Sequence, residues 1–495
     1  MSYTSLQFLI FVVVLLFVYY IVPKKYRWEI LLIGNLVCYY LMSGWLLLFV
    51  VLASLISYFG AKLIDKKKEK RKILFIVSLL SVLGFLLILK YNNFISSILN
   101  PVLNIVNLNI PFKKFILPVG ISYYTLEMIS YLADVYLKKI KSETNYFKLL
   151  TFYTYFPKVL EGPISKYRDL SKEIFNEHSF NYENFRKAWV LIGIGFIKKL
   201  VIADRCGLFV NNFFIDGHTG FLTIPAIIFY TIQIYFDFSG CIDIVSGVSE
   251  LFGIKLAENF RQPFFSESIE EFWRRWHITL GLWLKEYVFF PVSLSKTNMK
   301  LNKKMRNAKY KHLSKFVLIA FPLFFVWFFN GLWHGPTLKY VLYGLYYYIL
   351  MMLGILFKPV LEKIVKVLRI NTEVFSWKLF RILRTTFIVC IGMLIFRSET
   401  ITDAFNTLAN IRVMDSVNFF DLGINIKELV PLLVMIIAMF FISLAKELKI
   451  DVREKLEEQN LVFRWLVYWI IIFSVIIFGV YGRGYDAASF IYGGF

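Results

Sequence analysis

Residues 316–357 read FVLIAFPLFFVWFFNGLWHGPTLKYVLYGLYYYILMMLGILF. Two apolar runs, each close to the length of about 20 residues that a membrane-spanning helix needs, flank the segment NGLWHGPT at 330–337. This segment places His334 directly before Gly335 and Pro336, residue types that interrupt helices. The stretch therefore predicts two membrane helices with an ionisable side chain between them, and such a side chain is a candidate for function.

The whole chain has the composition of a membrane protein. Of its 495 residues, 58% are hydrophobic and 19% are aromatic, which excludes an ordinary soluble fold of this length. Apolar stretches begin at Ser5 and recur at 30–61, 73–89, 115–133, 187–203, 221–238, 316–333, 340–357, 385–396, 428–445 and 462–481. They predict an all-α polytopic membrane protein with roughly eleven transmembrane helices. Shorter apolar segments at 147–160 and 241–254 are predicted to be re-entrant or partial crossings.

The domain organisation is simple. No repeat of fixed period and no Pro/Gly/Ser linker divides the sequence, so residues 1–495 are predicted to form one integral membrane domain, with its last helices in 378–495. The first apolar run has no basic residue before it and no small-residue cleavage site after it, which favours a retained span over a signal peptide. The four cysteines are scattered, so neither a disulfide framework nor a cysteine metal site is expected.

The formal net charge of +22 is concentrated in a few loops. The main basic clusters are at 65–72, 138–141, 296–315 and 358–384, and such clusters lie on the cytoplasmic side of membrane proteins. All of them can lie inside if the N-terminus is outside, which also places the C-terminus outside and His334 in the outer half or middle of the membrane. Because the charges are divided among loops without stacking aromatics, no nucleic-acid partner is expected.

Several carboxylates stand in apolar context, where each needs a partner or water. Glu127 and Asp134 are seven residues apart and would share a helix face. For Asp134, an internal hydrogen-bonded pair or a position at an interfacial helix end is the favoured interpretation. Ser239 and the following glycine are expected to break a helix before Asp243. Asp237 and Asp243 are interpreted as structural, with the alternative that one of them lines a polar path.

Glu161 precedes a Gly-Pro pair, which predicts that a helix ends there. The backbone groups left unpaired at such an end must be satisfied by protein or by water in a cavity. We therefore expect Glu161 in a cavity wall and do not expect it to be catalytic.

The segment SESIEEFWRRWHITLGLWLKEYVFFPV, residues 266–292, has a different character. Ser268 and Glu271 match a capping box at a helix start. The aromatic and leucine side chains that follow fall on one stripe at helical spacing: Trp273, Trp276, Leu280, Trp283, Leu284 and Tyr287. The pattern predicts a helix in the membrane interface, with indoles at headgroup depth and Arg274 and Arg275 on lipid phosphates. His277, at the margin of the stripe, would point inward, and its role as a structural or a functional histidine stays open.

His334 is the stronger candidate for chemistry. A neutral imidazole can take a proton at neutral pH, so His334 is suited to be a general base. Asn330 stands one helical turn earlier and could hold an imidazole nitrogen or a reacting carbonyl. The residue types alone leave a purely structural histidine as the alternative.

Six blocks follow one another between about residue 115 and residue 350: LPVGISYYTLEMISYLADVY, FPKVLEGPI, KKLVIADR, YFDFSGCIDIVSGVSELFGIKLAENF, FWRRWHITLGLWLKEYVFFPV and NGLWHG. Together they closely resemble the membrane-bound O-acyltransferase family, nearest to its bacterial alginate O-acetyltransferase branch and more distantly to the D-alanyl transferase of teichoic acids. The resemblance implies a ring of helices around a thinned centre, with an inner and an outer funnel joined by a tunnel. It also implies that His334, in the WHG block, is the essential catalytic residue and that His277 lies near the same site.

The resemblance further implies an activity in a bacterial cytoplasmic membrane. A short acyl group, most simply acetyl, would pass from a cytosolic thioester to a hydroxyl of an extracytoplasmic polysaccharide, or of a partner protein that relays it. The donor would be acetyl-CoA or an acidic carrier protein, and no bound cofactor or metal is expected. Donor phosphates or lipid headgroups would lie near four residues: Trp273, Arg274, Arg275 and Trp276. His334 would act as base, and Asn330 or His277 would orient it or stabilise the oxyanion. The candidates for the tunnel wall are Glu161, Asp237, Ser239 and Trp333.

The chain departs from the family pattern at a few positions. Lys285 and Glu286 replace an Arg-Asp pair with the charges kept, Cys241 replaces a common tyrosine, and Glu161 replaces a common alanine. These differences leave the implied chemistry in place, and they put the identity of the acceptor in question.

Two other classes of function stay open on the residues alone. A transporter or flippase for a lipid-linked sugar would also use broken helices and intramembrane carboxylates, and it predicts that Glu127, Asp237 and Asp243 matter more than the histidines. A non-catalytic membrane scaffold predicts that both histidines tolerate substitution. A two-histidine metal site lacks a third ligand at a suitable spacing.

Overall fold

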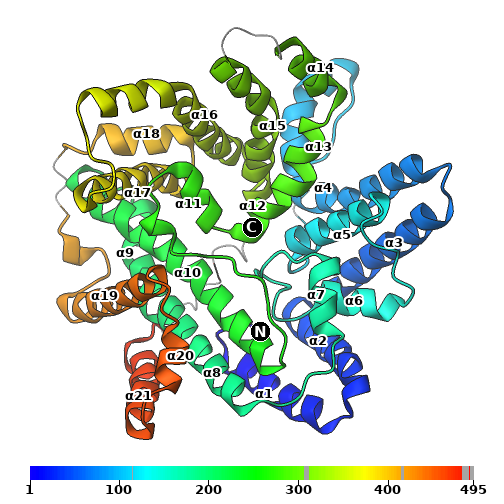
Figure 1. The fold of residues 1–495 in the computed structure, drawn as a ribbon, viewed down its shortest axis with the longest axis horizontal. Coiled ribbons are helices and arrows are strands. Elements are labelled where there is room, and N and C mark those ends of the chain that lie inside the picture. Colours follow the sequence, from blue (N-terminus) through cyan, green and yellow to red (C-terminus); the bar gives the residue numbers. More distant parts are fainter. Residues whose placement is uncertain (114, 306–310, 414–416, 482–489, 491–495) are drawn as a thin grey trace.

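The computed structural model describes the chain except for residues 114, 306–310, 414–416, 482–489 and 491–495. Within the described residues every regular element is a helix, apart from one antiparallel bridge between Phe260 and Trp276. The prediction of an all-α polytopic protein is confirmed. Seen down the shortest axis, the long helices surround a centre that holds two short helices, α11 (Ile269–Arg275) and α12 (Ile278–Leu284) (Figure 1).

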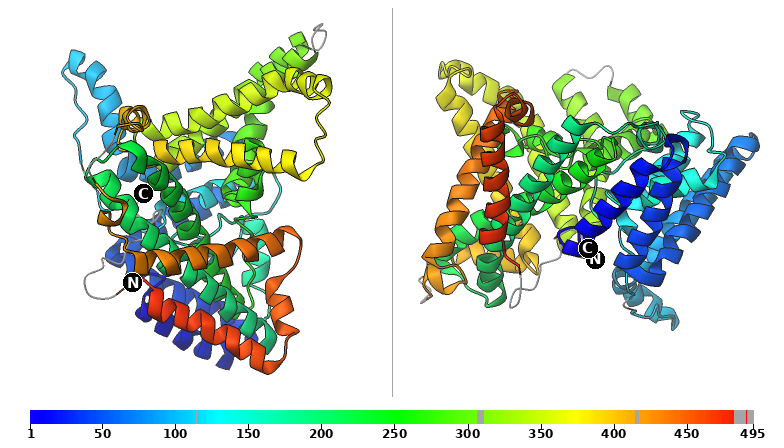
Figure 2. Two further views of the ribbon diagram at one scale, coloured as in Figure 1. Left: turned by 90° about the vertical axis from the view of Figure 1, so that its left-hand side faces the viewer. Right: turned by 90° about the horizontal axis from the view of Figure 1, so that it is seen from below.

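Eight stretches of the described chain are long and apolar enough to cross a membrane. They contain α2 (Arg27–Ser43) with α3 (Leu47–Lys66), α4 (Arg71–Leu103), α10 (Thr223–Leu251), α15 (Lys311–His334), α16 (Leu338–Val367), α17 (Phe375–Arg397), α19 (Ile426–Glu447) and α21 (Leu461–Phe478). Three other predicted spans form shorter helices: α1 (Leu6–Ile21), α5 (Ile121–Tyr136) and α8 (Tyr182–Phe196). Of these three, α1 and α5 are short, whereas α8 continues directly into a π-helical segment, Ile197–Ala203. The three spans account for the difference from the roughly eleven predicted crossings. The side views show the orange and red helices α19 and α21 running side by side (Figure 2).

Two sequence predictions for the region around residue 240 are wrong: the helix break and the re-entrant segment. The break at Ser239 and Gly240 does not occur, because α10 continues through both residues to Leu251, and the predicted re-entrant segment 241–254 consists mainly of its last turns. Gly240 serves close packing instead, since a Cβ there would meet Gly195 O of α8 at 2.9 Å. Segment 147–160 does form a partial element, α6 (Tyr146–Thr154), so this helix ends well before Glu161.

The predicted single interfacial helix at 266–292 is also wrong. Its start is confirmed, because Ser268 accepts a hydrogen bond from Glu271 N, whereas the Glu271 carboxylate binds Glu267 N. The helix stops after Arg275, and His277 adopts a left-handed conformation with φ 47°. Here the backbone bonds to a neighbouring segment instead of to itself, since Ile278 N donates to Asn259 O at 3.0 Å. A long-range backbone pairing has overridden the local helical periodicity.

Contacts between helix ends define one face of the molecule, which we call the basic face. They are Tyr20 with Leu251 O, Arg453 with Glu250, Arg275 with Glu447, Arg381 with Glu267, and Ser142 with Asp65. The basic clusters at 65–72 and 138–141 and the basic start of α17 lie on this face. The loop at 296–315 and the C-terminus lie partly outside the described residues.

Candidate active site

The position of His334 is set by the close backbone contact between α15 and α16. His334 is the last residue of α15, and α16 begins only four residues later, as the Gly-Pro pair predicts. A Cβ at Gly331 would meet Tyr340 O at 2.2 Å, and one at Gly344 would meet Trp327 O at 2.2 Å. Because no side chain separates the helices at these points, α15 and α16 form a close hairpin with His334 at its inner corner.

The structure brings the two candidate histidines to one indole. The Trp333 ring lies 5.3 Å from the His277 ring and 5.1 Å from the His334 ring, measured between centroids. His334 also packs against Tyr343 at 5.9 Å and Phe396 at 5.3 Å. Both histidines are buried, with exposures of 2% and 3%. Residues 57 positions apart in sequence thus share one enclosed aromatic site.

Asn259 orients His277, although no role was predicted for Asn259. Asn259 Oδ1 lies 3.3 Å from His277 Nδ1 and accepts hydrogen bonds from Thr279 N at 3.1 Å and Thr279 Oγ1 at 2.8 Å. An amide oxygen can only accept a hydrogen bond, so this contact requires Nδ1 to be the protonated nitrogen. Nε2 is then an acceptor, and it has no hydrogen-bond partner among the described residues. The Glu-Asn dipeptide after an apolar helix was the available sequence signal for Asn259. No local sequence pattern connects this residue to His277.

Two further polar candidates, Asn330 and Ser239, are buried. Asn330 lies one turn before His334 with 6% exposure, and Ser239 has 2% exposure. Within the described chain neither Asn330 Oδ1 nor Ser239 Oγ has a hydrogen-bond partner. The proposed bond between Asn330 and the His334 imidazole is therefore not formed here, and a role toward a reacting carbonyl stays a prediction.

Glu161 is fully buried in a turn, and neighbouring side chains connect it to the site of the two histidines. Its carboxylate interacts with the Cys241 thiol and lies within electrostatic reach of the Tyr123 hydroxyl. The Tyr123 ring in turn packs on Trp333 at 5.4 Å. Two of the departures from the family pattern, Glu161 and Cys241, are thus neighbours in space.

The other intramembrane carboxylates are paired with lysines. Asp237 binds Lys199 at 2.5 Å, Asp243 binds Lys198 at 2.5 Å, and Glu127 binds Lys158. These ion pairs are consistent with the structural interpretation of both aspartates, and a place for Asp237 in the tunnel wall stays a prediction. These pairings weaken the transport hypothesis, which needs the same carboxylates for cargo.

Trp273 and Trp276 of the 266–292 segment pack against other aromatic side chains of the protein. Trp276 is 2% exposed and stacks on Phe272 at 5.5 Å, while Trp273 packs edge-on against Tyr347 at 4.8 Å. Arg275 is engaged inside the protein, where it pairs with Glu271 at 2.6 Å and Glu447 at 2.7 Å. Arg274 is 68% exposed and pairs only with the equally exposed Glu270. Of the two arginines, Arg274 is the one accessible to a donor phosphate.

Lys90 is a second residue that the sequence interpretation missed. The predicted span ended at 89, which would make Lys90 a lysine at a membrane surface, but α4 continues to Leu103. Lys90 is 7% exposed, and its Nζ donates to Ser122 Oγ at 2.9 Å and to Trp333 O at 3.1 Å. The apolar residues on both sides of Lys90 were the available signal of burial.

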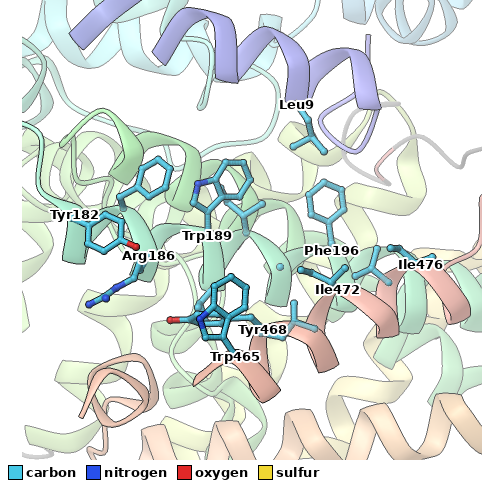
Figure 3. Close-up of a pocket in the computed structure, with 15 residues that line it drawn as sticks. Leu9, Tyr182, Arg186, Trp189, Phe196, Trp465, Tyr468, Ile472 and Ile476 are labelled. Carbon is cyan, nitrogen blue, oxygen red and sulfur yellow. The ribbon is translucent and has the colours of Figure 1, made fainter. Parts of the chain in front are cut away.

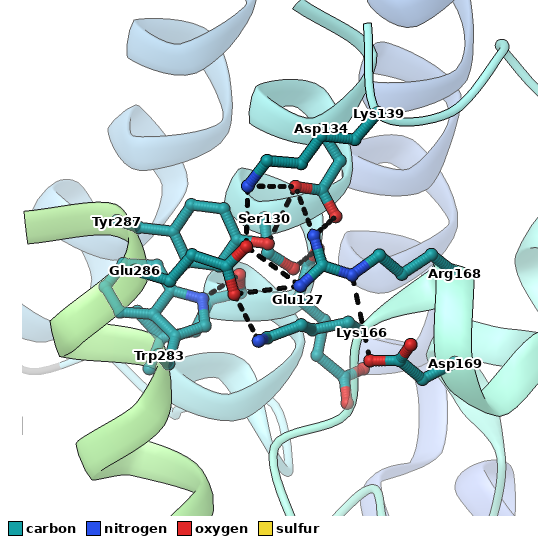
Figure 4. Close-up of polar contacts among 11 residues, drawn as sticks. Glu127, Ser130, Asp134, Lys139, Lys166, Arg168, Asp169, Trp283, Glu286 and Tyr287 are labelled. Atoms are coloured by element: carbon teal, nitrogen blue, oxygen red, sulfur yellow. Dashed lines mark hydrogen bonds and ion pairs between the residues drawn. The ribbon is translucent and has the colours of Figure 1, made fainter. Parts of the chain in front are cut away.

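A network of charges lies where the loop after α5 meets the end of α12 (Figure 4). Arg168 binds Asp134 at 3.2 Å and Glu286 at 2.8 Å, and Glu286 also accepts from Lys139 at 2.6 Å and from Lys166. Burial alone would raise the pKa of Glu286, but the hydrogen bonds from Lys139, Lys166 and Arg168 lower it to about 2. The predicted internal pairing of Asp134 is confirmed, and Glu286 carries the negative charge that the family pattern assigns to this position.

A cavity, a pocket and a groove lie among the helices and loops described above. A cavity of 510 Å³ on the basic face is lined by Lys139, Lys166, Lys285 and Glu286. A polar pocket of 240 Å³ is lined by Tyr340 and Phe396, which pack on each other and close to His334, and by Lys339 and Arg397. An apolar groove of 530 Å³ lies between α1, α8 and α21 and contains neither histidine (Figure 3). In the described part of the chain, no group of three His, Cys, Asp or Glu residues could hold a metal ion.

Comparison with known proteins identifies the family of this chain. The model of the family described as MBOAT, membrane-bound O-acyltransferase, matches residues 9–396. A probable alginate O-acetylase of Pseudomonas syringae pv. tomato is 32% identical over 412 residues, covering 81% of this chain and 73% of that protein. A peptidoglycan O-acetyltransferase of Helicobacter pylori is 30% identical over 55% of this chain and 53% of that protein. A teichoic acid D-alanyltransferase of Bacillus subtilis is 30% identical over 47% of this chain and 57% of that protein. The chain therefore belongs to the membrane-bound O-acyltransferase family, and it is an acyltransferase of the membrane.

Proposed function

We propose that this protein moves an acetyl group from a cytosolic thioester to a hydroxyl outside the membrane, on a polysaccharide or on a partner protein that relays the group. The observation that carries the proposal is the enclosed site in which Trp333 contacts both His277 and His334. Relatives named for O-acetylation of alginate and of peptidoglycan support acetyl as the group and a glycan as the final acceptor.

The donor is assigned to the basic face, which we take as cytosolic because basic loops face the cytosol. The cavity beside Lys139, Lys166 and Lys285 and the exposed Arg274 offer positive charge to the phosphates of acetyl-CoA or to an acidic carrier protein. The thioester end of the donor would then reach inward toward the histidines, with Trp273 and Trp276 as the aromatic wall.

The acceptor is assigned to the opposite side. The polar pocket bounded by Tyr340 and Phe396 adjoins the aromatic shell of His334 and includes Lys339 and Arg397. A hydroxyl entering there would meet the thioester at His334. One ring nitrogen of His334 takes the hydroxyl proton, the oxygen attacks the carbonyl carbon, and the leaving thiolate later receives that proton from the imidazolium. His277, held by Asn259, presents Nε2 to the same space.

The test is the acetyl-ester content of surface glycans in cells that carry His334→Ala, His277→Ala or the unchanged protein. Membrane levels are matched by quantitative blotting, and Phe324→Leu, a change on the exposed side of α15, serves as the control. We expect acetyl esters to disappear with His334→Ala and to fall strongly with His277→Ala. Unchanged esters in His334→Ala cells at normal protein level would overturn the assigned chemistry.

A further inference from the structure

Lys90 differs from the other buried lysines of the described chain. Lys158 and Lys199 each bind a carboxylate, so their charges are neutralised where they lie. Lys90 Nζ instead donates to a hydroxyl, Ser122 Oγ, and to a backbone oxygen, Trp333 O, and no carboxylate in the described chain lies within ion-pair distance. An uncompensated ammonium inside a membrane protein is costly and marks a functional position.

The capping of the end of α15 does not explain why a positively charged residue stands at position 90. The neighbouring residue, Tyr91, donates its hydroxyl to Leu332 O at 2.6 Å, one residue before the carbonyl that Lys90 binds. A neutral donor thus performs the same task on the same helix end, where four carbonyls have no partner within the helix. An apolar protein interior would retain a second neutral donor at lower cost than a cation.

The position of Lys90 suits a reaction that creates negative charge. Its ammonium lies within electrostatic reach of the His334 ring, and it is anchored to the residue directly before His334. A lysine ammonium has three N–H donors, and two of them are used by Ser122 and Trp333. The third donor is available to a ligand that binds beside His334.

We infer that Lys90 is an oxyanion-stabilising residue of the acyl transfer, an inference that rests on the proposed function. As the acceptor oxygen bonds to the thioester carbon, the carbonyl π electrons move onto oxygen, and the third N–H of Lys90 donates to that oxyanion. When the tetrahedral intermediate collapses, the electrons return, the C–S bond breaks and the thiolate takes the proton held by His334. Lys90 keeps all its protons throughout, so it contributes charge and a hydrogen bond but no proton transfer.

The experiment compares Lys90→Met, Lys90→Gln and Tyr91→Phe in washed membranes, with acetyl-CoA as the probe donor. Release of the CoA thiol gives kcat and KM, and thermal unfolding in detergent gives the stability of each variant. Removal of one oxyanion donor typically lowers kcat by about 10²–10³-fold, and we expect this for Lys90→Met with KM for acetyl-CoA unchanged within about threefold. Lys90→Gln, which keeps a neutral donor, should fall between the wild type and Lys90→Met. Tyr91→Phe should lose no more than about threefold in kcat, since its bond to Leu332 O is structural.

The outcomes separate this inference from the proposed function. If His334→Ala abolishes thiol release while Lys90→Met stays within threefold of wild type, Lys90 has no catalytic part. An equal loss in Tyr91→Phe and Lys90→Met would also overturn the inference, because it would show that the helix end matters and the charge does not. If folded wild-type protein releases no thiol and His334→Ala leaves glycan acetylation intact, the proposed function itself fails. Should Lys90→Met not accumulate, the kcat of Lys90→Gln decides the question.

Discussion

The His277 ring packs against the Trp333 indole at a centroid distance of 5.3 Å, and the same indole lies 5.1 Å from the ring of His334, the next residue along α15. The contact joins the hairpin of α15 and α16 to the break between α11 and α12. Each histidine is positioned by its own element, and the indole fixes the spacing between them.

Asn259→Ala should impair catalysis more than stability. The substitution removes the acceptor that fixes the His277 tautomer and leaves Thr279 Oγ1 without that partner. A displacement of about 1 Å in a catalytic group can cost about 10²-fold in rate, so we expect a fall in kcat of that order. Thr279→Val, which breaks the Thr279 hydroxyl contact but leaves Asn259 in place, is the matched control and should lose much less. Equal kcat values for the two variants would contradict the assigned role of Asn259.

The two adjacent arginines should separate stability from donor binding. Arg275→Ala breaks half-buried ion pairs to Glu271 and Glu447 and should cost about 1–3 kcal/mol of stability. Arg274→Ala breaks an exposed pair and should change stability by less than about 0.5 kcal/mol.

Donor kinetics provide the second readout for Arg274. If it binds donor phosphates, Arg274→Ala raises KM for acetyl-CoA and leaves KM for acetyl-pantetheine, which has no phosphate, unchanged. A parallel rise for both donors would argue against a phosphate contact.

Acid should loosen the charge network around Glu286. The pKa of this carboxylate is about 2 in the folded protein, below its usual value near 4.5, because of the bonds from Lys139, Lys166 and Arg168. A lowered folded pKa means that the stabilisation is complete above the unfolded pKa and disappears as the pH falls through the folded value. Thermal unfolding in detergent should therefore shift to lower temperature between about pH 4.5 and pH 2. Glu286→Gln should start from a lower unfolding temperature and show a flatter pH dependence over this range.

Gly331→Ala should disrupt the site by separating two helices. The added Cβ would lie 2.2 Å from Tyr340 O, a backbone atom that cannot move aside alone. Overpacking of this kind costs about 1–3 kcal/mol, and the shift of α15 against α16 should also reduce acetyl transfer. Gly354→Ala is the control on α16, because a Cβ there meets nothing within 4 Å. We expect Gly354→Ala to equal or slightly exceed the wild type in unfolding temperature.

Features that depend on local composition could be predicted from the sequence alone. Apolar runs of sufficient length located the membrane helices, because a backbone in lipid must satisfy its own hydrogen bonds. The Ser268 cap and the end of α15 at His334 followed from residue types that favour those ends. His277 and His334 could be singled out because ionisable groups are costly at that depth.

Other features depended on partners far away along the chain, and only the tertiary structure decided them. Lys90 and the Trp333 carbonyl are 243 residues apart, and the Asn259 segment breaks the predicted helix at His277 by a backbone pairing that no local pattern contains. The lysine partners of Asp237 and Glu127 come from other elements, and only the packed structure brings each lysine to its carboxylate. Helix formation is governed by near neighbours and by the solvent, whereas the neutralisation of a buried charge and the orientation of an imidazole are governed by whichever groups the packed helices bring within about 3 Å.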